Sequence, residues 1–432
     1  MTVKHLFQQC LIILLIPFPA SRAQAPWPQF RGPWGNGLAT LSGTEPLGLP
    51  IRWSEKENIR WKTPIPYRGW STPVVMDGQV WLTTATLDGH DFFVLCVDRD
   101  SGQIRVQEKL FHADHPEPLG NPLNCYASPS PVVEPGRVYV HFGSYGTAAL
   151  NTKTGEVLWK RSDLPCRHYR GPGSSLLLFE NLLILTMDGV DIQYLVALDK
   201  ETGRTVWKTD RTAQWDDLNA DGKPKDEGDL RKAYSTPLVA TVGGNTQVLS
   251  VGAKALYGYD PMSGRELWKI PTPAFSGAAS PVYGQGIAYM ITGFGKTELL
   301  AIRLDSRADV TDANIAWRTA RMVPQTPSPV LVDDLFFMIN DAGVVTCLEA
   351  DSGKQVWRER LEGDFAASLL YADGHVYCFS REGVATVLKA ARNYEVVATN
   401  VLDSGFMASP AVSGRTLFLR TKESLYRIES SQ

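Results

Sequence analysis

The feature of the sequence that most constrains the fold is a motif that recurs along the chain with constant internal spacing. It has a small or apolar lead-in, an acidic residue or Asn, a turn glycine and then a tryptophan, as in ALDKETGRTVWK at 197–208. Related copies are LNTKTGEVLWK, YDPMSGRELWK and LEADSGKQVWR, which end near Trp159, Trp268 and Trp357. A strand-rich repeat of this kind is typical of a propeller or a solenoid.

Each copy of the repeat opens with a serine followed by proline or an apolar residue. The openings are STPVV at 71, SPVV at 130, SSLLL at 174, STPLV at 235, SPVY at 280, SPVL at 328, SLLY at 368 and SPAV at 409. After each opening come a turn, an alternating strand, a third strand that leads into the acidic turn, and a fourth strand with the tryptophan. Four short strands per unit indicate a propeller blade.

The two ends of the repeat region complete one another. The last copy, which opens at Ser409, stops after its third strand, while NIRWKTPIP at 58–66 precedes the first opening and carries Trp61. We expect this segment to be the missing fourth strand, because pairing the chain ends removes the exposed edges of an open stack. The sequence therefore predicts an all-β fold, a single eight-bladed β-propeller over 58–429 closed by its N- and C-terminal strands.

The repeated motif has an architectural explanation. An acidic residue or Asn four residues before Gly favours a tight turn in which Gly takes the positive-φ position. The tryptophan of the outer strand is expected to cover the crevice between neighbouring blades. The tryptophans at this place are Trp61, Trp159, Trp207, Trp268, Trp317 and Trp357, whereas Val106 and Val397 occupy it in the first and seventh copies.

The N-terminus has the pattern of a secretion signal. Lys4 and His5 precede the apolar run 11–18, and small residues lead to Ala23. Residues 1–23 are interpreted as a cleaved signal peptide and 24–57 as a leader segment before the propeller. The apolar run is too short to span a membrane, and a formal net charge of −3 gives no reason to expect nucleic-acid binding. We therefore expect a soluble protein that is exported to the periplasm or the extracellular space.

The cysteines outside the signal segment fall into two groups. Cys96, Cys347 and Cys378 lie in alternating apolar strands and are expected to be core side chains. Cys125 and Cys166 lie in loops that lead into successive repeats, and export permits disulfides. They are the candidate disulfide, although connectivity does not follow from sequence alone.

Long connections at 110–127, 162–173 and 209–234 lead into the second, third and fourth blades. Repeat proteins often bind through inserted loops, so an asymmetric binding surface is expected here. Side chains shortly before the opening serines are expected to point into the central funnel, where they would either hold a small aromatic or anionic ligand or plug a closed channel. These residues are Trp70, Tyr126, His168, Arg170, Tyr234, Gln325 and Phe406.

One loop partly matches a calcium-binding pattern. Asp217, Asn219 and Asp221, followed by a glycine, have the spacing of the first ligands of a calcium loop. The twelfth position is Gly228 in place of the usual Glu, and Glu227 and Asp229 flank it. Calcium is therefore one interpretation of this loop, and a solvated acidic loop is the other.

Motifs for catalysis are scarce. The chain contains no H-E-x-x-H, G-x-S-x-G or phosphate-cradling glycine loop. His112 and His115 have a metal-like spacing but no third ligand nearby in sequence. His168 could serve as an acid–base group, but the sequence offers no partner to orient it.

The A-x-D-x-x-T-G-x-x-x-W motif together with the Ser-Pro openings resembles the pyrroloquinoline-quinone (PQQ) type of propeller repeat, which includes the BamB-type propellers of outer-membrane assembly. The resemblance covers 58–429, and WPQFRGPWGNGLA at 27–39 is similar to the leader of exported PQQ-like proteins of planctomycete type. The quinoprotein dehydrogenases of this repeat type carry two adjacent cysteines and a Glu/Asn/Asp calcium set. This chain has no adjacent cysteines and no match to that set.

These observations together predict an exported, non-catalytic propeller scaffold that needs no cofactor. It would bind a protein partner or a small ligand on the face with the inserted loops. The alternatives are a quinone-dependent dehydrogenase and an outer-membrane assembly factor of the BamB type.

Overall fold

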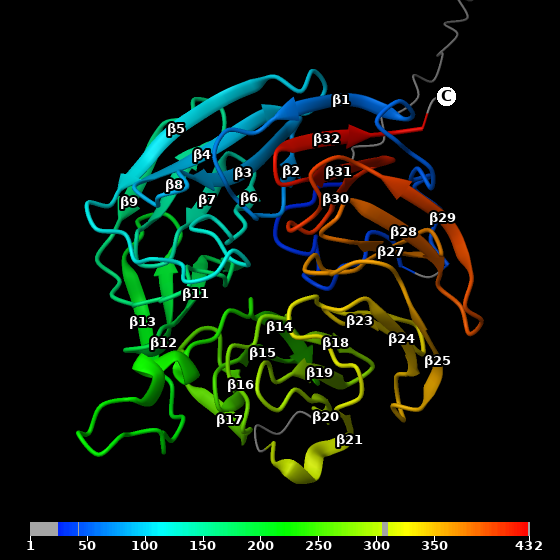
Figure 1. Cartoon of the computed structure of the whole chain (residues 1–432). Helices are drawn as coiled ribbons and strands as arrows, with labels where there is room; N and C mark the ends of the chain where they lie inside the picture. Colours follow the sequence, from blue (N-terminus) through cyan, green and yellow to red (C-terminus); the bar gives the residue numbers. More distant parts are fainter. Residues whose placement is uncertain (1–24, 42, 305–309, 431–432) are drawn as a thin grey trace, which may run out of the picture.

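The chain folds into a ring of eight blades, each a sheet of four antiparallel strands (Figure 1). A computed structural model describes residues 25–41, 43–304 and 310–430. The ring confirms the predicted all-β propeller and its number of blades. The predicted signal peptide at 1–23 lies outside the described residues.

The blades follow one another in chain order, and in every blade except the fourth the first strand is the shortest. Blade one has β2 (Val74–Met76), β3 (Gln79–Ala85), β4 (Asp91–Asp98) and β5 (Ile104–His112); blade two has β6 (Val132–Glu134), β7 (Arg137–His141), β8 (Thr147–Asn151) and β9 (Val157–Arg161); blade three has β10 (Leu177–Phe179), β11 (Leu182–Asp188), β12 (Gln193–Asp199) and β13 (Thr205–Asp210); blade four has β14 (Leu238–Val242), β15 (Asn245–Val251), β16 (Ala255–Tyr259) and β17 (Glu266–Pro271).

The second half of the ring repeats this order. Blade five has β18 (Val282–Gly284), β19 (Ile287–Ile291), β20 (Leu299–Arg303) and β21 (Ile315–Thr319); blade six has β22 (Val330–Val332), β23 (Leu335–Ile339), β24 (Val344–Glu349) and β25 (Gln355–Arg360); blade seven has β26 (Leu370–Ala372), β27 (His375–Phe379), β28 (Val384–Lys389) and β29 (Val396–Val401); blade eight has β30 (Ala411–Ser413), β31 (Thr416–Arg420), β32 (Ser424–Ile428) and β1 (Ile59–Pro64). Two short 3-10 helices, η1 (Lys225–Arg231) and η2 (Asp312–Asn314), lie in connections.

Blade eight closes the ring as the sequence predicts. Its strand order is β1-β32-β31-β30, and β1 runs antiparallel to β32 from the Ile59–Ile428 pair to the Pro64–Ser424 pair. Figure 1 shows the blue β1 beside the red β32. Because the N-terminal strand completes a C-terminal blade, neither end of the repeat array leaves an uncovered sheet.

The acidic turn and its glycine fit the blades together. In blade three the Asp199 carboxylate accepts hydrogen bonds from the backbone N–H and the hydroxyl of Thr202, which stabilises the turn between β12 and β13. Gly203 follows with φ near +70°, and a Cβ at this position would lie 2.6 Å from the Trp159 ring of blade two. Glycine is required twice over, by its backbone conformation and by the close approach of the indole.

Five of the six repeat tryptophans make the same contact with the following blade in the described structure. Their indole N–H groups donate to backbone carbonyls of Arg99, Lys200, Pro261, Ala350 and Ala391, from Trp61, Trp159, Trp207, Trp317 and Trp357 respectively. Trp268 differs, because its indole donates to Gln247 in its own blade and packs over Gly258, where a side chain would block it. The Trp61 contact shows that the joint between blades eight and one is built like the others.

The leader crosses the central axis of the ring. Trp27 pairs with Val75 of blade one, and the Pro28 carbonyl accepts from Val133 of blade two. Farther along, the buried Arg31 donates to the Pro329 carbonyl at the start of blade six. The Gly37 carbonyl accepts from the Tyr371 N–H of blade seven, and the Ala39 N–H donates to the Tyr371 carbonyl. Since blades two and six are on opposite sides of an eight-bladed ring, this segment must span the channel.

Among the described residues, no helix has the length and apolar character needed to cross a membrane.

Candidate functional site

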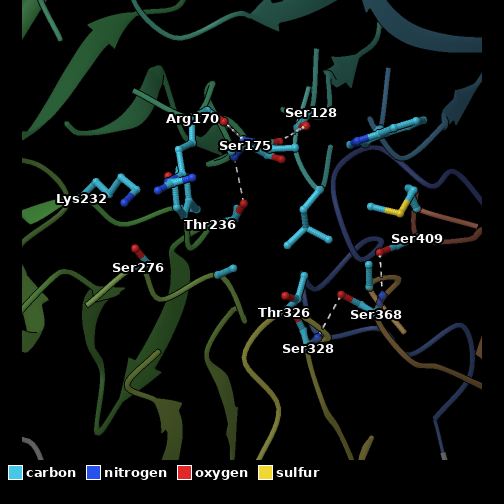
Figure 2. Close-up of a pocket in the computed structure, with 18 of the residues that line it drawn as sticks. Ser128, Arg170, Ser175, Lys232, Thr236, Ser276, Thr326, Ser328, Ser368 and Ser409 are labelled. Carbon is cyan, nitrogen blue, oxygen red and sulfur yellow. Dashed lines mark hydrogen bonds between the residues drawn. The ribbon is translucent and has the colours of Figure 1, made fainter. Parts of the chain in front are cut away.

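A ring of hydroxyl groups surrounds the central channel at the start of the innermost strands. Each blade contributes one residue to this hydroxyl ring, which consists of Thr72, Ser130, Ser175, Thr236, Ser280, Ser328, Ser368 and Ser409. Between six neighbouring pairs of these described residues, a backbone N–H of one blade donates to the hydroxyl oxygen of the next, at 2.9–3.2 Å. The dashed lines between Ser328, Ser368 and Ser409 in Figure 2 follow this chain of bonds.

The hydroxyl ring is interrupted at two joints. Between blades four and five the Ser235 hydroxyl donates instead to the Ala279 carbonyl, at 2.9 Å. Between blades eight and one the Arg420 guanidinium donates to the hydroxyl and carbonyl of Ser71. The Thr72 and Ser280 hydroxyls at these joints are buried and have no hydrogen-bond partner among the described residues.

A cavity of about 390 Å³ lies over the hydroxyl ring. We call this cavity the cup. Phe30 of the axis-crossing leader lines the cup and also lines a second cavity. The wall of the cup includes the residue two positions before each ring hydroxyl: Trp70, Ser128, Gly173, Tyr234, Ala278, Thr326, Ala366 and Met407. Because the eight blades repeat one backbone geometry, the position two residues before the ring hydroxyl faces the axis in every blade.

Three of the seven predicted funnel residues line the cup, namely Trp70, Arg170 and Tyr234. The other four, Tyr126, His168, Gln325 and Phe406, are not part of its lining. The sequence reading placed the openings of blades one, three and four one residue early, at Ser71, Ser174 and Ser235, and had no rule for which preceding residue faces the axis.

Alternation along the extended backbone explains two of these misplacements. Gln325 and Phe406 each lie three positions before a ring hydroxyl, so they point away from the axis. The Gln325 amide donates to the Thr297 hydroxyl, and Phe406 is buried against Phe379 in blade seven with ring centroids 5.3 Å apart. Tyr126, one residue earlier still in its own connection, donates its hydroxyl to the Glu117 carbonyl.

His168 is buried beneath the loop between β7 and β8. The Ser144 backbone N–H donates to its Nε2, and Cys166 Sγ lies 3.7 Å from its Nδ1. Burial lowers the pKa of His168 to about 4, so the imidazole is neutral near pH 7. This histidine supports a loop and is not positioned to exchange protons with a molecule in the cup.

A cluster of three charged groups lines one side of the cup. The Asp229 carboxylate accepts from Arg170 Nε at 3.2 Å and also pairs with the Lys232 ammonium. Figure 2 shows the Arg170 and Lys232 side chains next to each other, across the cup from Ser368 and Ser409. Sequence reasoning did not place Asp229 or Lys232 in the funnel, although both lie in the inserted connection at 209–234 and Asp229 was noted beside the calcium-like loop.

Two effects act in opposite directions on the pKa of Lys232. Its side chain is only 2% exposed, and burial together with the nearby Arg170 lowers its pKa to about 7. The ion pair with Asp229 acts in the other direction and favours the charged form. We take the lowered pKa as the net direction, because burial is nearly complete and Asp229 is shared with a second cation.

Two polar groups of the wall lack partners. Trp70 Nε1 and Tyr234 Oη are buried and make no hydrogen bond within the described part of the chain. Buried polar groups in proteins nearly always have a partner, supplied by protein, water or ligand. Both residues line the cup, so the cup is where such a partner would be found.

The acidic loop at 217–229 uses its carboxylate and amide groups locally. Asp217 pairs through both oxygens with Arg231, at 2.9 and 2.5 Å, and the Asn219 side chain accepts from the Asp221 and Lys223 backbone. Within the described ranges no group of three or more His, Cys, Asp or Glu side chains could hold a metal ion. Calcium binding by Asp217, Asn219, Asp221 and Glu227 stays an untested prediction.

The remaining candidates are also engaged locally. Cys125 and Cys166 are free thiols, with Cys125 Sγ at 3.3 Å from the Ser128 hydroxyl, so the candidate disulfide is not formed in this structure. His112 Nδ1 lies 2.7 Å from the Asp91 carboxylate, and its ring stacks on His90. Neither pair reaches the cup.

Comparisons with known proteins agree on the fold. A family model described as outer membrane protein assembly factor BamB matches residues 51–164 and 191–432. The crystal structure of BamB from Moraxella catarrhalis superposes with a TM-score of 0.58 at 12% identity, covering 86% of this chain and 99% of that one. No curated protein matches the chain.

Solved enzymes of the same architecture are similar as well. The quinohemoprotein alcohol dehydrogenase from Comamonas testosteroni gives a TM-score of 0.66 at 11% identity, covering 94% of this chain and 81% of that one. A europium-containing methanol dehydrogenase gives 0.53 at 11% identity, covering 94% and 90%. At these identities the likeness concerns the fold alone.

Proposed function

The chain belongs to the family described as outer membrane protein assembly factor BamB, and from this premise we propose that it is an exported, non-catalytic propeller that binds a small organic molecule in the cup. The observation that carries this proposal is the cup itself. Its volume of about 390 Å³ is within the range of small-molecule sites, and Phe30 of the leader is part of its lining.

The chemistry of the cup wall favours binding over catalysis. The wall combines aromatic rings, including Phe275 and Phe294, with a few polar groups gathered on one side. No histidine or cysteine belongs to the described lining, and the hydroxyl-ring oxygens in it mostly accept from backbone N–H groups. A serine nucleophile needs a neighbouring base, and this arrangement does not supply one.

The residues of the cup do not fit a calcium-bound quinone, the cofactor of the dehydrogenases with this repeat. Calcium in such a site needs several oxygen ligands of hard, mostly anionic character. Asp229 is the one carboxylate of the described lining, and it already pairs with Arg170 and Lys232. We therefore assign no redox step to this chain.

A small-molecule site in the cup can be tested by filling it. Thr326→Trp places an indole in the wall of the cup, whereas Leu87→Trp adds one at a side chain that is 65% exposed and outside the lining. A thermal-shift screen of small organic acids, amides and amines should find compounds that stabilise the parent chain and the Leu87→Trp variant but not Thr326→Trp. A screen without any stabilising compound, or with equal stabilisation of both variants, would reject the site.

A second candidate function, capture of a protein partner, is favoured by the inserted connections. The connections before blades two, three and four contribute Asn121, Arg170 and Asp229 to the rim and wall of the cup, and loops of this kind often bind. Affinity purification of the full chain from outer-membrane extracts tests this function. We expect one partner in constant proportion, whose retention is lost when residues 213–224 are replaced by a short glycine-serine linker.

A further inference from the structure

The charges that face the cup do not cancel. Arg170 and Lys232 contribute two cations, and Asp229 contributes the one carboxylate among the described lining residues. Below the pKa of Lys232 the cluster therefore has one positive charge in excess. The Lys232 side chain is buried, and an unpaired charge at a buried group is unfavourable, so the cluster favours an anion beside it.

The donor groups of the cluster are only partly used by protein atoms. Lys232 Nζ donates to the backbone carbonyl of Asp229 at 2.9 Å and to its carboxylate, which leaves one ammonium hydrogen. Arg170 directs Nε and Nη2 toward the two oxygens of the same carboxylate, at 3.2 and 3.5 Å, and the Nη1 group and the second Nη2 hydrogen remain as further donors. Trp70 Nε1 and the Tyr234 hydroxyl add unpartnered donors in the same wall.

The rest of the cup is apolar or weakly polar. Phe30 from the leader, Phe275 and Phe294 from blade five, and Met407 and Ala366 from the last blades lie around it. The ring hydroxyls that line the cup each accept from a backbone N–H group, and their own O–H groups are neutral donors that carry no charge to balance a second negative charge. An occupant would therefore be charged at one end and apolar along its body.

We propose that the cup binds a small apolar monocarboxylate, whose carboxylate is held between Arg170 and Lys232 and whose body lies against the phenylalanine rings. This inference rests on the proposed function of the cup and adds the class of its ligand. One carboxylate neutralises the single excess charge, whereas a phosphate dianion would leave one negative charge buried without a partner.

Isothermal titration of the purified full chain at pH 6 tests the ligand class with compounds of one shape. Benzoate is the anion, benzamide its neutral isostere, benzylamine the cation and phenyl phosphate the alternative anion. We expect benzoate to bind about tenfold or more tightly than benzamide and phenyl phosphate, because a charge-assisted hydrogen bond is worth at least this factor. Benzylamine should not bind.

The outcomes distinguish a wrong ligand class from the absence of any binding site in the cup. Benzamide or benzylamine binding as well as benzoate would overturn the carboxylate assignment and leave the cup as a binding site. Phenyl phosphate binding more tightly than benzoate would replace carboxylate by phosphate and also overturn it. Binding of none of the compounds, together with the absence of any stabilising compound in the screen described above, would remove the proposed function itself.

Two substitutions in the cluster should act in opposite directions. Lys232→Met removes the excess charge and is expected to weaken benzoate binding about tenfold. Asp229→Asn removes the competing carboxylate and should strengthen it several-fold. Damage to the fold would weaken binding in both variants, so opposite signs are the diagnostic result, and weakening in both would overturn the inference. Lys153→Met, at an exposed turn of blade two, is the control and should change nothing.

Discussion

The two halves of the ring share one scaffold and differ in what they bring to the cup. Blades one to four contribute the charged cluster and the indole and phenol groups, all from the connections that lead into them. Blades five to eight contribute Ala278, Thr326, Ala366 and Met407 at the equivalent positions. The hydroxyl ring runs through both halves, with one interruption at each joint between them.

The comparison teaches how a closed repeat fold acquires a site. The hydrogen bonds that hold the blades together come from positions present in every repeat, so the inserted connections are free to carry other groups. The charged side chains of the cup therefore come from the inserted connections, on one side of an otherwise regular wall.

The largest effect is expected at the buried ion pair between Arg211 and Asp188, which lies in the half of the ring with the inserted connections. Arg211, at the end of blade three, donates to the Asp188 carboxylate at 3.0 and 2.7 Å and to the Ser250 hydroxyl of blade four. Arg211→Met should lower the free energy of unfolding by about 3–5 kcal/mol, because it leaves Asp188 buried and unpaired. Urea denaturation measures this.

Two variants serve as references for that measurement. The double variant Asp188→Leu/Arg211→Met should recover much of the loss, since no charge is then left unpaired. Arg360→Met in blade six should change stability by less than about 1 kcal/mol, because that guanidinium is exposed and donates to the Ala342 carbonyl. Equal losses at Arg211 and Arg360 would contradict the distinction between the halves.

Lowering the pH should reduce the free energy of unfolding, because His168 in the connection before blade three is buried in its neutral form. Burial lowers the folded-state pKa of His168 to about 4, below the ordinary value of 6.5. Between these values the unfolded chain binds a proton that the folded chain does not. Stability is therefore complete above pH 6.5 and falls as the pH is lowered toward 4, by about 3 kcal/mol from this group.

Urea denaturation between pH 7 and pH 4.5 measures this slope. The His168→Gln variant, which keeps an acceptor for Ser144 but does not titrate, should show a flatter dependence. The slope does not vanish, because burial also lowers the pKa of His141 to about 3. An unchanged slope in the variant would exclude His168 as its source.

Substitution of the turn glycine should lower stability equally in the two halves of the ring. Gly203 and Gly353 have φ near +70° and +68°, and a Cβ at either would lie 2.6 Å from a tryptophan of the preceding blade. Substitution of either by Ala should destabilise by about 2–3 kcal/mol, from backbone strain and overpacking together. Gly374→Ala is the matched control, with φ near +79° and no atom within 4 Å of the added Cβ, and should cost about 1 kcal/mol. A clear difference between Gly203→Ala and Gly353→Ala would show that the halves differ in their packing as well.

The smallest effect is the pH dependence of ligand binding. The pKa of Lys232 is lowered to about 7, so its ammonium loses its proton as the pH rises from 6 to 8. Arg170 and Asp229 face it with opposite charges that remain, and burial raises the pKa of Tyr234, which stays neutral. Benzoate, ionised throughout, should bind about tenfold more weakly at pH 8 than at pH 6.

Titration calorimetry at the two pH values gives the result directly. The Lys232→Met variant should bind benzoate weakly and almost equally at both. A parent chain with the same affinity at pH 6 and pH 8 would show that Lys232 does not supply the charge.

Much of the fold could be predicted from the sequence because its determinants are local and repeated. The acidic turn, its glycine and the tryptophan each act within one blade or between adjacent blades, so their spacing encodes the architecture. The lone strand around Trp61 and the incomplete last copy even reveal how the ring closes. The contact of Trp268 with its own blade was not predictable in this way, because it depends on the small size of Gly258 across the sheet.

The candidate site was predicted less well, for physical reasons that particular residues show. Trp70, Arg170 and Tyr234 could be found from their place before the opening serines. Gln325 and Phe406 were misplaced because a shift of one residue in an extended strand turns a side chain to the opposite side.

By itself, the sequence determined the blade, the number of repeats and the strand that joins the two ends, since these depend on contacts between neighbours in the chain or in the ring. Only the tertiary structure decided what the ring encloses. Arg170 meets Asp229 and Lys232 although 59 positions separate Arg170 from Asp229, and the leader reaches from blade two to blade six across the axis. Closure of the ring creates both contacts, because it brings residues from distant repeats to one central axis.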